Sequence, residues 1–164
     1  MVPQLKVSGL KIGLAAIALA AATVVTAHAA VGPFGALAGS WAGGGVLTRA
    51  DGGQERLQCR ASYAPAQNNL RLNIRCASPS YSFDLASDVA YNGGAISGQW
   101  SETSRNANGT LSGQANGDRI EAQARSDLFS ASLSVTTRGN KQSVAIRPQG
   151  GAEVSAVSIT MQRR

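Results

Sequence analysis

The stretch Gln54–Cys76, QERLQCRASYAPAQNNLRLNIRC, decides the fold. Read with a period of two, it places apolar side chains on one face of each of two runs, which is the pattern of half-buried β-strands. A turn at residues 66–69 sets Tyr63 opposite Leu72 and Cys59 opposite Cys76. Because both cysteines then point into the same core, the stretch predicts a β-hairpin closed by a disulfide.

The chain after residue 38 repeats this pattern. Short runs rich in Ser, Thr, Val and Ile alternate with glycine- and asparagine-containing turns, and no sustained helical stripe of apolar residues appears. We therefore predict an all-β fold, an up-and-down antiparallel meander of about ten strands forming a closed or nearly closed barrel. Gly43-Gly44-Gly45 predicts a sharp bend or bulge in the first strand.

Four further turns set the expected registers of the meander. Ser78-Pro79 should make a tight connection, and Asn92-Gly93-Gly94, Asn116-Gly117 and Gly139-Asn140 should each close a hairpin. The expected facing pairs are Cys76 with Tyr81, Ile74 with Phe83, Tyr91 with Ile96, Leu111 with Ala122, and Val135 with Val144.

The first residues have the features of a targeting segment. Lys6 and Lys11 precede an apolar run at residues 12–25, and Ala27-His28-Ala29 carries small residues where a signal peptidase cleaves. The run is shorter than the roughly 20 residues that span a bilayer. We predict a signal peptide at 1–29, a lead-in segment at 30–38 and a single β-barrel domain at 39–164, located in the periplasm or secreted.

Composition argues against catalysis and against nucleic acid as a partner. The leader carries two of the 15 Lys and Arg residues and none of the nine acids, so the remainder has 13 against nine, a net charge of +4. Basic residues alternate with acids along the chain, which is unlike a nucleic-acid-binding stripe. The single histidine, His28, lies in the leader, and its loss removes the commonest general base and zinc ligand. We expect no enzyme activity, no catalytic residues, no metal and no cofactor.

Small side chains fall on the inward face of the later strands, and they leave two alternatives open. Either the barrel flattens until its walls meet, or it keeps a cavity. A cavity would be a site for a small apolar ligand with a polar end. The candidate lining residues are Trp41, Tyr63, Tyr91, Trp100 and Phe129, with Glu102 at the mouth.

A second candidate site is the arginine face, the outward side chains Arg56, Arg60, Arg71 and Arg75. Arg60 should lie directly across from Arg75, with Asp84 diagonal to Arg71 and Arg75. Like charges that face each other need neutralisation. The face is either solvated and partly ion-paired, or it receives an anionic ligand or an acidic envelope protein.

Two fragments resemble known barrel families. Leu37-Ala38-Gly39-Ser40-Trp41 is similar to the Gly-x-Trp that opens the first strand of lipocalins and to the opening strand of avidins. Gly94–Trp100, GAISGQW, resembles an avidin strand. The resemblance implies a calycin-type barrel, with Trp41 matching the first-strand tryptophan. The opening also looks like that of small periplasmic inhibitors of metalloproteases, which implies that Val31–Ala38 could enter a protease cleft.

We predict an exported, non-catalytic, monomeric binding module for a small apolar or anionic molecule or an envelope protein. It could touch a membrane surface without being integral. Three alternatives stay open. One is the protease inhibitor. Another is a hydrolase without histidine that pairs Glu102 with Glu121 or Asp127. The third is an outer-membrane barrel, which the lack of aromatic girdles and the end Arg163-Arg164 disfavour.

Overall fold

The computed structural model describes residues 32–150 and 152–164, so the predicted signal peptide lies outside the described residues. One short 3-10 helix, η1, precedes ten strands. Their bounds are η1 Gly35–Leu37, β1 Gly39–Arg49, β2 Gln54–Ala66, β3 Asn69–Ala77, β4 Ser82–Asn92, β5 Ala95–Glu102, β6 Ala107–Asn116, β7 Arg119–Arg125, β8 Ser130–Arg138, β9 Lys141–Gln149 and β10 Val154–Arg163.

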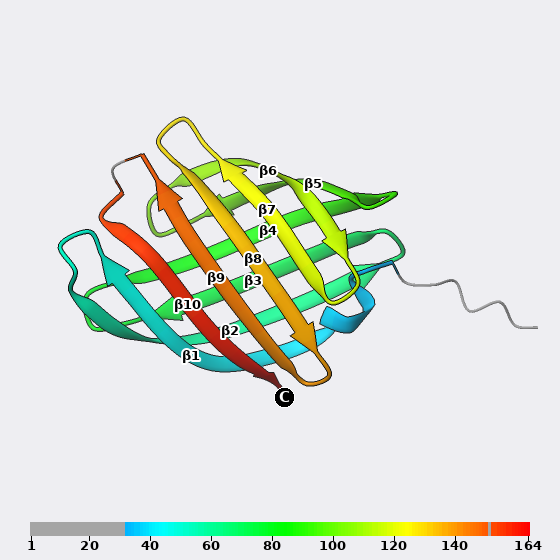
Figure 1. Cartoon of the computed structure of the whole chain (residues 1–164), viewed down its shortest axis with the longest axis horizontal. Coiled ribbons are helices and arrows are strands. Elements are labelled where there is room, and N and C mark those ends of the chain that lie inside the picture. Colours follow the sequence, from blue (N-terminus) through cyan, green and yellow to red (C-terminus); the bar gives the residue numbers. More distant parts are fainter. Residues whose placement is uncertain (1–31, 151) are drawn as a thin grey trace, which may run out of the picture.

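The strands form a closed barrel in which each strand pairs with its neighbours in the chain (Figure 1). β1 also pairs antiparallel with β10, from Trp41 opposite Arg163 to Arg49 opposite Val154. This pairing removes both sheet edges. The predicted all-β, up-and-down barrel is therefore confirmed.

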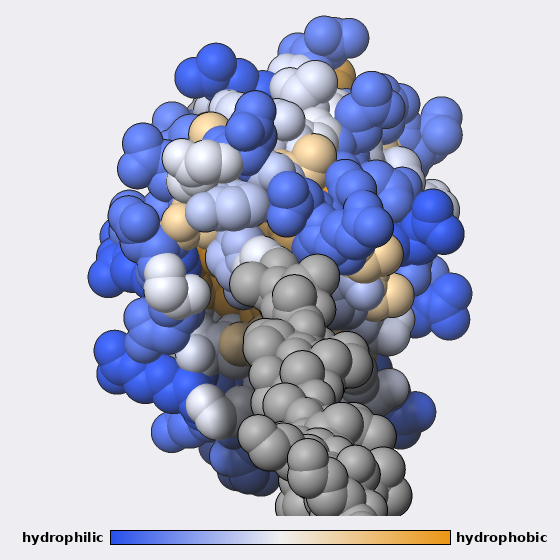
Figure 2. Space-filling model, turned by 90° about the vertical axis from the view of Figure 1, so that its right-hand side faces the viewer, coloured by the Kyte–Doolittle hydropathy of each residue, from blue (hydrophilic) through white to orange (hydrophobic). Residues whose placement is uncertain are grey.

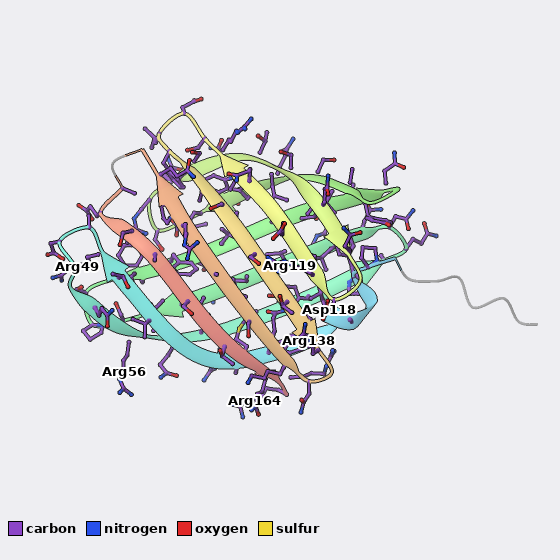
Figure 3. The ribbon with its side chains drawn as sticks, viewed as in Figure 1. Arg49, Arg56, Asp118, Arg119, Arg138 and Arg164 are labelled. Carbon is purple, nitrogen blue, oxygen red and sulfur yellow. A yellow bond between two sulfur atoms is a disulfide. The ribbon has the colours of Figure 1, made fainter. Side chains whose placement is uncertain are left out.

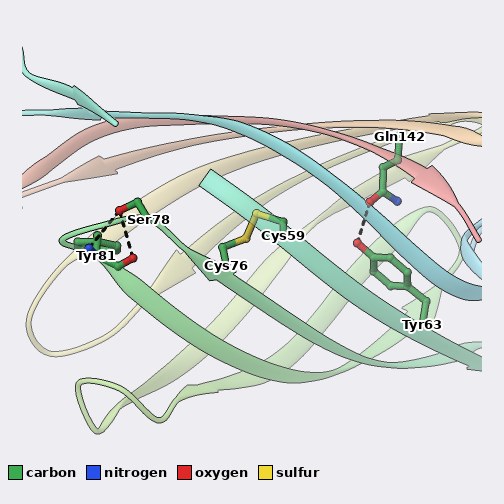
Figure 4. The surroundings of a disulfide bond; sticks show 6 residues. All are labelled: Cys59, Tyr63, Cys76, Ser78, Tyr81 and Gln142. Atoms are coloured by element: carbon green, nitrogen blue, oxygen red, sulfur yellow. Dashed lines mark hydrogen bonds between the residues drawn. A yellow bond between two sulfur atoms is a disulfide. The ribbon is translucent and has the colours of Figure 1, made fainter. Parts of the chain in front are cut away.

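The β2–β3 hairpin has the predicted register. Tyr63 lies opposite Leu72 and Cys59 opposite Cys76, and the two sulfurs form a disulfide with Cα atoms 4.2 Å apart (Figure 4). Both cysteines are buried. A disulfide-bonded barrel fits an exported protein, because such bonds persist in oxidising compartments. Within residues 32–150 and 152–164, no helix has the length and apolar character needed to cross a bilayer.

The register between β3 and β4 differs from the prediction by two residues. Cys76 lies opposite Phe83 and Ile74 opposite Leu85. The cause is a longer connection: the backbone N–H of Ser78 donates to the Tyr81 carbonyl at 2.7 Å, which closes a loop over residues 78–81. A shift by two leaves every side chain on its predicted face.

The β6–β7 turn also falls one residue later than predicted. Asn116 pairs with Arg119, so Gly117 and Asp118 form the turn and Leu111 faces Ala124. Gly117 has φ of 56°. A two-residue hairpin with glycine at the first central position suits this backbone. The pairs Tyr91 with Ile96 and Val135 with Val144 are as predicted.

The glycines of β1 allow β10 to approach closely. A Cβ atom on Gly43 would lie 2.0 Å from the Thr160 carbonyl oxygen, and one on Gly45 would lie 1.9 Å from that of Ser158. The pairing with β10 stays continuous through these glycines, and the irregularity falls instead at Thr48 and Arg49. Of the bend or bulge expected at Gly43–Gly45, the continuous register excludes a bulge, and the glycines there allow close contact with the β10 backbone.

The helix η1 closes one end of the barrel. Its Leu37 and the preceding Phe34 are buried, and the indole N–H of Trp41 donates to the Leu37 carbonyl at 2.7 Å. Arg163 donates to the carbonyls of Ala36 and Ala38 and lies 4.5 Å from the Trp41 ring centroid. Figure 2 shows this end, where the most apolar surface sits inside a hollow surrounded by hydrophilic residues.

Candidate functional site

The barrel encloses a cavity of about 610 Å³. Inward side chains of nearly every strand line it, and Ala122, Ala124 and Ala131 take the place of larger residues on β7 and β8. These alanines are buried, yet they are too short to reach the opposite wall. Of the two alternatives that the sequence leaves open, the structure has the cavity.

The polar groups along the cavity wall already have partners. The Tyr63 hydroxyl donates to Gln142 Oε1 at 2.8 Å (Figure 4), and burial raises the pKa of Tyr63 well above its ordinary value. The Ser87 hydroxyl donates to the Gln99 carbonyl at 2.7 Å. The Trp100 indole donates to a carbonyl of β6. The surface that the wall presents to a ligand is therefore aliphatic and aromatic. A polar group of the ligand placed deep inside would find no hydrogen-bond partner, at a cost of about 1–3 kcal/mol.

Glu102 is buried at the end of β5, beside this cavity. Its carboxylate accepts hydrogen bonds from the backbone N–H groups of Asp84 at 3.0 Å, Ser104 at 2.9 Å and Arg105 at 2.9 Å. Burial acts to raise the pKa of Glu102, and these hydrogen bonds outweigh it, so the pKa lies below its usual value. The carboxylate therefore holds the turn at residues 103–106.

That turn places Arg105 at the rim of the cavity. The guanidinium carbon lies 4.0 Å from the Tyr81 ring centroid. Its Nη1 donates to the Ser82 carbonyl at 3.0 Å and lies 3.7 Å from Glu102 Oε2. The side chain is 44% exposed, so the charge faces water and the cavity together.

The mouth of the cavity lies at this end, opposite η1. Four connections between strands contribute to its lining, through Tyr81, Arg105, Leu128, Phe129, Gly150, Ala152 and Glu153. Leu128 is 76% exposed there, and the Phe129 ring packs on Trp100 with centroids 5.8 Å apart. A ligand would reach the interior between these connections, since the other end is closed by the buried side chains of Phe34 and Leu37.

Four of the six side chains predicted for a ligand line the cavity, namely Tyr63, Trp100, Glu102 and Phe129. The other two lie outside the lining. Trp41 is covered by η1 and packs edge-to-face on Tyr63 at 6.5 Å, and Tyr91 packs edge-to-face on Phe34 at 6.3 Å. The alternation along a strand shows that a side chain points inward, but it does not show whether that side chain lies at the closed end or beside the cavity.

The structure adds two rim residues that sequence reasoning missed, Tyr81 and Arg105. Both lie in connections between strands. The sequence predicts Tyr81 in a strand opposite Cys76, outside the candidate site, whereas Arg105 falls where the alternation of apolar and polar residues stops. Only the charge of Arg105, next to the predicted Glu102 in the chain, could have pointed to the rim.

The arginine face is exposed and partly ion-paired. Arg60 lies across from Arg75, as predicted. Arg75 pairs with Asp84 at 2.7 Å and Arg71 with Asp88 at 3.0 Å, directly across the β3–β4 pair. Asp84 is therefore not diagonal, because of the longer connection before β4. Figure 3 shows Arg56 pointing away from the barrel.

The lead-in segment is packed into the molecule where the structure describes it. Phe34 is 0% exposed and Leu37 is 3% exposed. The resemblance to metalloprotease inhibitors implied that Val31–Ala38 acts as an arm, whereas residues 34–37 fill the closed end of the barrel.

Apolar side chains point into the barrel, and polar ones point outward. Along β2, Leu57, Cys59 and Ala61 are buried while Arg56 and Arg60 are exposed. An outer-membrane barrel has the opposite arrangement, with an apolar outer band and a polar interior. The molecule is thus a closed, ten-stranded antiparallel barrel with an apolar cavity and a charged rim.

Two solved structures share this fold. Rv2717c from M. tuberculosis matches with a TM-score of 0.65 at 14% identity, covering 80% of this chain and 94% of the other. The S-type phycobiliprotein lyase CPES from Guillardia theta matches with a TM-score of 0.55 at 11% identity, covering 80% and 89%. No protein-family model matches the sequence, and no curated protein matches it. At these low sequence identities the similarity concerns the fold alone.

The prediction that the protein is not an enzyme is contradicted. It was based on the missing histidine after residue 29 and on treating such a barrel as a binding module. The phycobiliprotein lyase, an enzyme by its name, has the same fold. A barrel of this kind therefore does not argue against catalysis, since one fold hosts many functions.

Proposed function

We propose that this protein binds a small, predominantly apolar molecule inside its barrel. The observation that carries the proposal is the cavity of about 610 Å³, closed at one end by Phe34 and Leu37 and open at the other. Ligand sites in proteins typically measure about 300–1,000 Å³ and are lined mainly by apolar and aromatic side chains.

The chemistry of the wall supports an apolar ligand. Leu72, Ile74, Leu133 and Val135 contribute branched aliphatic surface, and Trp100 adds an aromatic ring. Each methylene group moved from water into such surroundings contributes about 0.8 kcal/mol. Because the wall's polar groups are occupied, a ligand gains little there from hydrogen bonding.

The disulfide and the predicted leader support the envelope as the place where this occurs. A protein that shields an apolar molecule inside its barrel would transport or store that molecule in an aqueous compartment. In that setting we propose a monomer with the periplasm or the extracellular medium as its location.

The test is uptake of N-phenyl-1-naphthylamine, a neutral dye that fluoresces in apolar surroundings. Ala122→Phe fills the cavity from a buried position on β7, and Ala145→Phe adds the same ring at an exposed position on β9. We expect the unaltered protein and Ala145→Phe to take up the dye, with dodecanol displacing it, and Ala122→Phe to lose most of the uptake. If the dye does not bind, or if both variants bind it equally, the proposal is wrong.

A further inference from the structure

Building on the proposed function, we infer that the ligand is an amphiphile whose carboxylate end is held at the cavity mouth by Arg105. The apolar tail would occupy the cavity, and the head group would stay at the rim, where water and the guanidinium both reach it. The inference names the ligand class and a residue that recognises it.

The position of Arg105 is restrained before any ligand arrives. Two backbone N–H groups of its turn, those of Ser104 and Arg105, donate to Glu102. The Arg105 guanidinium lies on the Tyr81 ring, and its Nη1 donates to the Ser82 carbonyl. A restrained side chain loses less conformational entropy when it binds a ligand.

Donors remain for a ligand. A guanidinium carries five N–H groups, and in the described part of the chain its hydrogen bonding is limited to Nη1. Paired N–H groups on such a planar fork match the two oxygens of a carboxylate. The rim thus has a cation with unused donors beside an apolar cavity.

The acids at the rim decide whether the head group is an anion or a cation. The Glu102 carboxylate already accepts three backbone N–H groups and lies 3.7 Å from Arg105 Nη1, so its oxygens are engaged within the protein and are not directed at a ligand cation. Glu153 also lines the mouth, but it is exposed and solvated. Arg105 is the only basic side chain among the lining residues that the structure describes. A carboxylate therefore gains more there than an ammonium group.

The experiment compares dodecanoate, dodecanol and dodecylamine by isothermal titration calorimetry, below the micelle concentrations of the two ionic compounds and below the aqueous solubility of dodecanol. Three proteins are used: the unaltered protein, Arg105→Gln, and the control Arg147→Gln, which makes the same charge change on the outer wall at an exposed residue. We expect dodecanoate to bind about fivefold more tightly than dodecanol to the unaltered protein and to the control. Arg105→Gln should abolish this preference and leave dodecanol binding unchanged, which also shows that the variant is folded.

Equal binding of dodecanoate and dodecanol to the unaltered protein would overturn the inference, as would tighter binding of dodecylamine. An unchanged preference in Arg105→Gln would do the same. Dodecyl phosphate serves as a further arm, and tighter binding of it than of dodecanoate would overturn the assignment of a carboxylate. In all these cases dodecanol still binds and the proposed function stands, whereas failure of every compound to bind removes the proposed function itself.

Discussion

Replacing Glu102 by glutamine should destabilise the protein and flatten its response to acid. The carboxylate accepts three backbone N–H groups with little exposure to water. A glutamine keeps one acceptor oxygen, and its amide N–H₂ would face backbone donors in place of the second. Hydrogen bonds to charged groups contribute about 1.5–3 kcal/mol each. Losing the interactions of one oxygen predicts a loss of about 2–3 kcal/mol in the free energy of unfolding.

The pH dependence gives this prediction an independent signature. The pKa of Glu102 is lower in the folded protein than its ordinary value. Its contribution to stability is therefore fully present above the unfolded-state pKa and is lost as the pH falls towards the folded-state pKa. The difference in unfolding free energy between the unaltered protein and Glu102→Gln should shrink as the pH falls through this acid range.

Urea unfolding between pH 3 and pH 7, followed by tryptophan fluorescence, measures both effects. The matched control is Glu121→Gln, the same change at an exposed position on β7, which should alter stability by less than about 0.5 kcal/mol. If Glu102→Gln unfolds with the same midpoint as this control at pH 7, the hydrogen bonds to Glu102 do not hold the turn as argued.

Three further predictions concern the Cys59–Cys76 disulfide, the cavity and strand β1. Replacing Cys59 and Cys76 by alanine opens a loop spanning 17 residues and should lower the unfolding free energy by about 3 kcal/mol in urea titrations; an unchanged midpoint would contradict this. Calorimetry of octanol, decanol and dodecanol should show about fourfold tighter binding per added methylene, from about 0.8 kcal/mol each, and a flat series would mean that the chains do not enter the cavity. Gly45→Ala sets a Cβ atom against the Ser158 carbonyl. Circular dichroism should therefore show loss of the native fold, or thermal unfolding at a much lower temperature. Unfolding at the temperature of the unaltered protein would show that β1 and β10 can move apart to make room for the methyl group.

Most of the barrel could be predicted from the sequence because alternation and turn residues act locally. The disulfide register and the Val135–Val144 pair follow from turns of two residues, Gln67-Asn68 and Gly139-Asn140, whose neighbours must pair. The connection after Ala77 was misjudged because its length depends on hydrogen bonds between Ser78 and Tyr81, from the backbone and from the Ser78 hydroxyl, and on Glu55 of β2, which accepts from Ser78. The contact with β2 is tertiary, so the local sequence does not give it.

The site was predicted only in part, for a different reason. Alternation identifies which side chains point inward, and it placed Tyr63, Trp100 and Phe129 correctly on the interior. It gives no information on depth along the barrel axis, so Trp41 at the closed end was grouped with the cavity. Arg105 sits in a turn, and its position at the rim depends on the hydrogen bonds from this turn to Glu102 and on its contact with Tyr81, which are tertiary arrangements.

The pairing of β1 with β10 has a consequence for the newly made chain. Trp41 and Arg163 face each other across the seam, and Arg163 also anchors the helix that seals the base. A chain that has not yet reached β10 cannot close the ring, because β1 has no other strand to pair with on that side. Contacts between segments far apart in the sequence form slowly, so the barrel stays open until β10 has been made and has paired with β1.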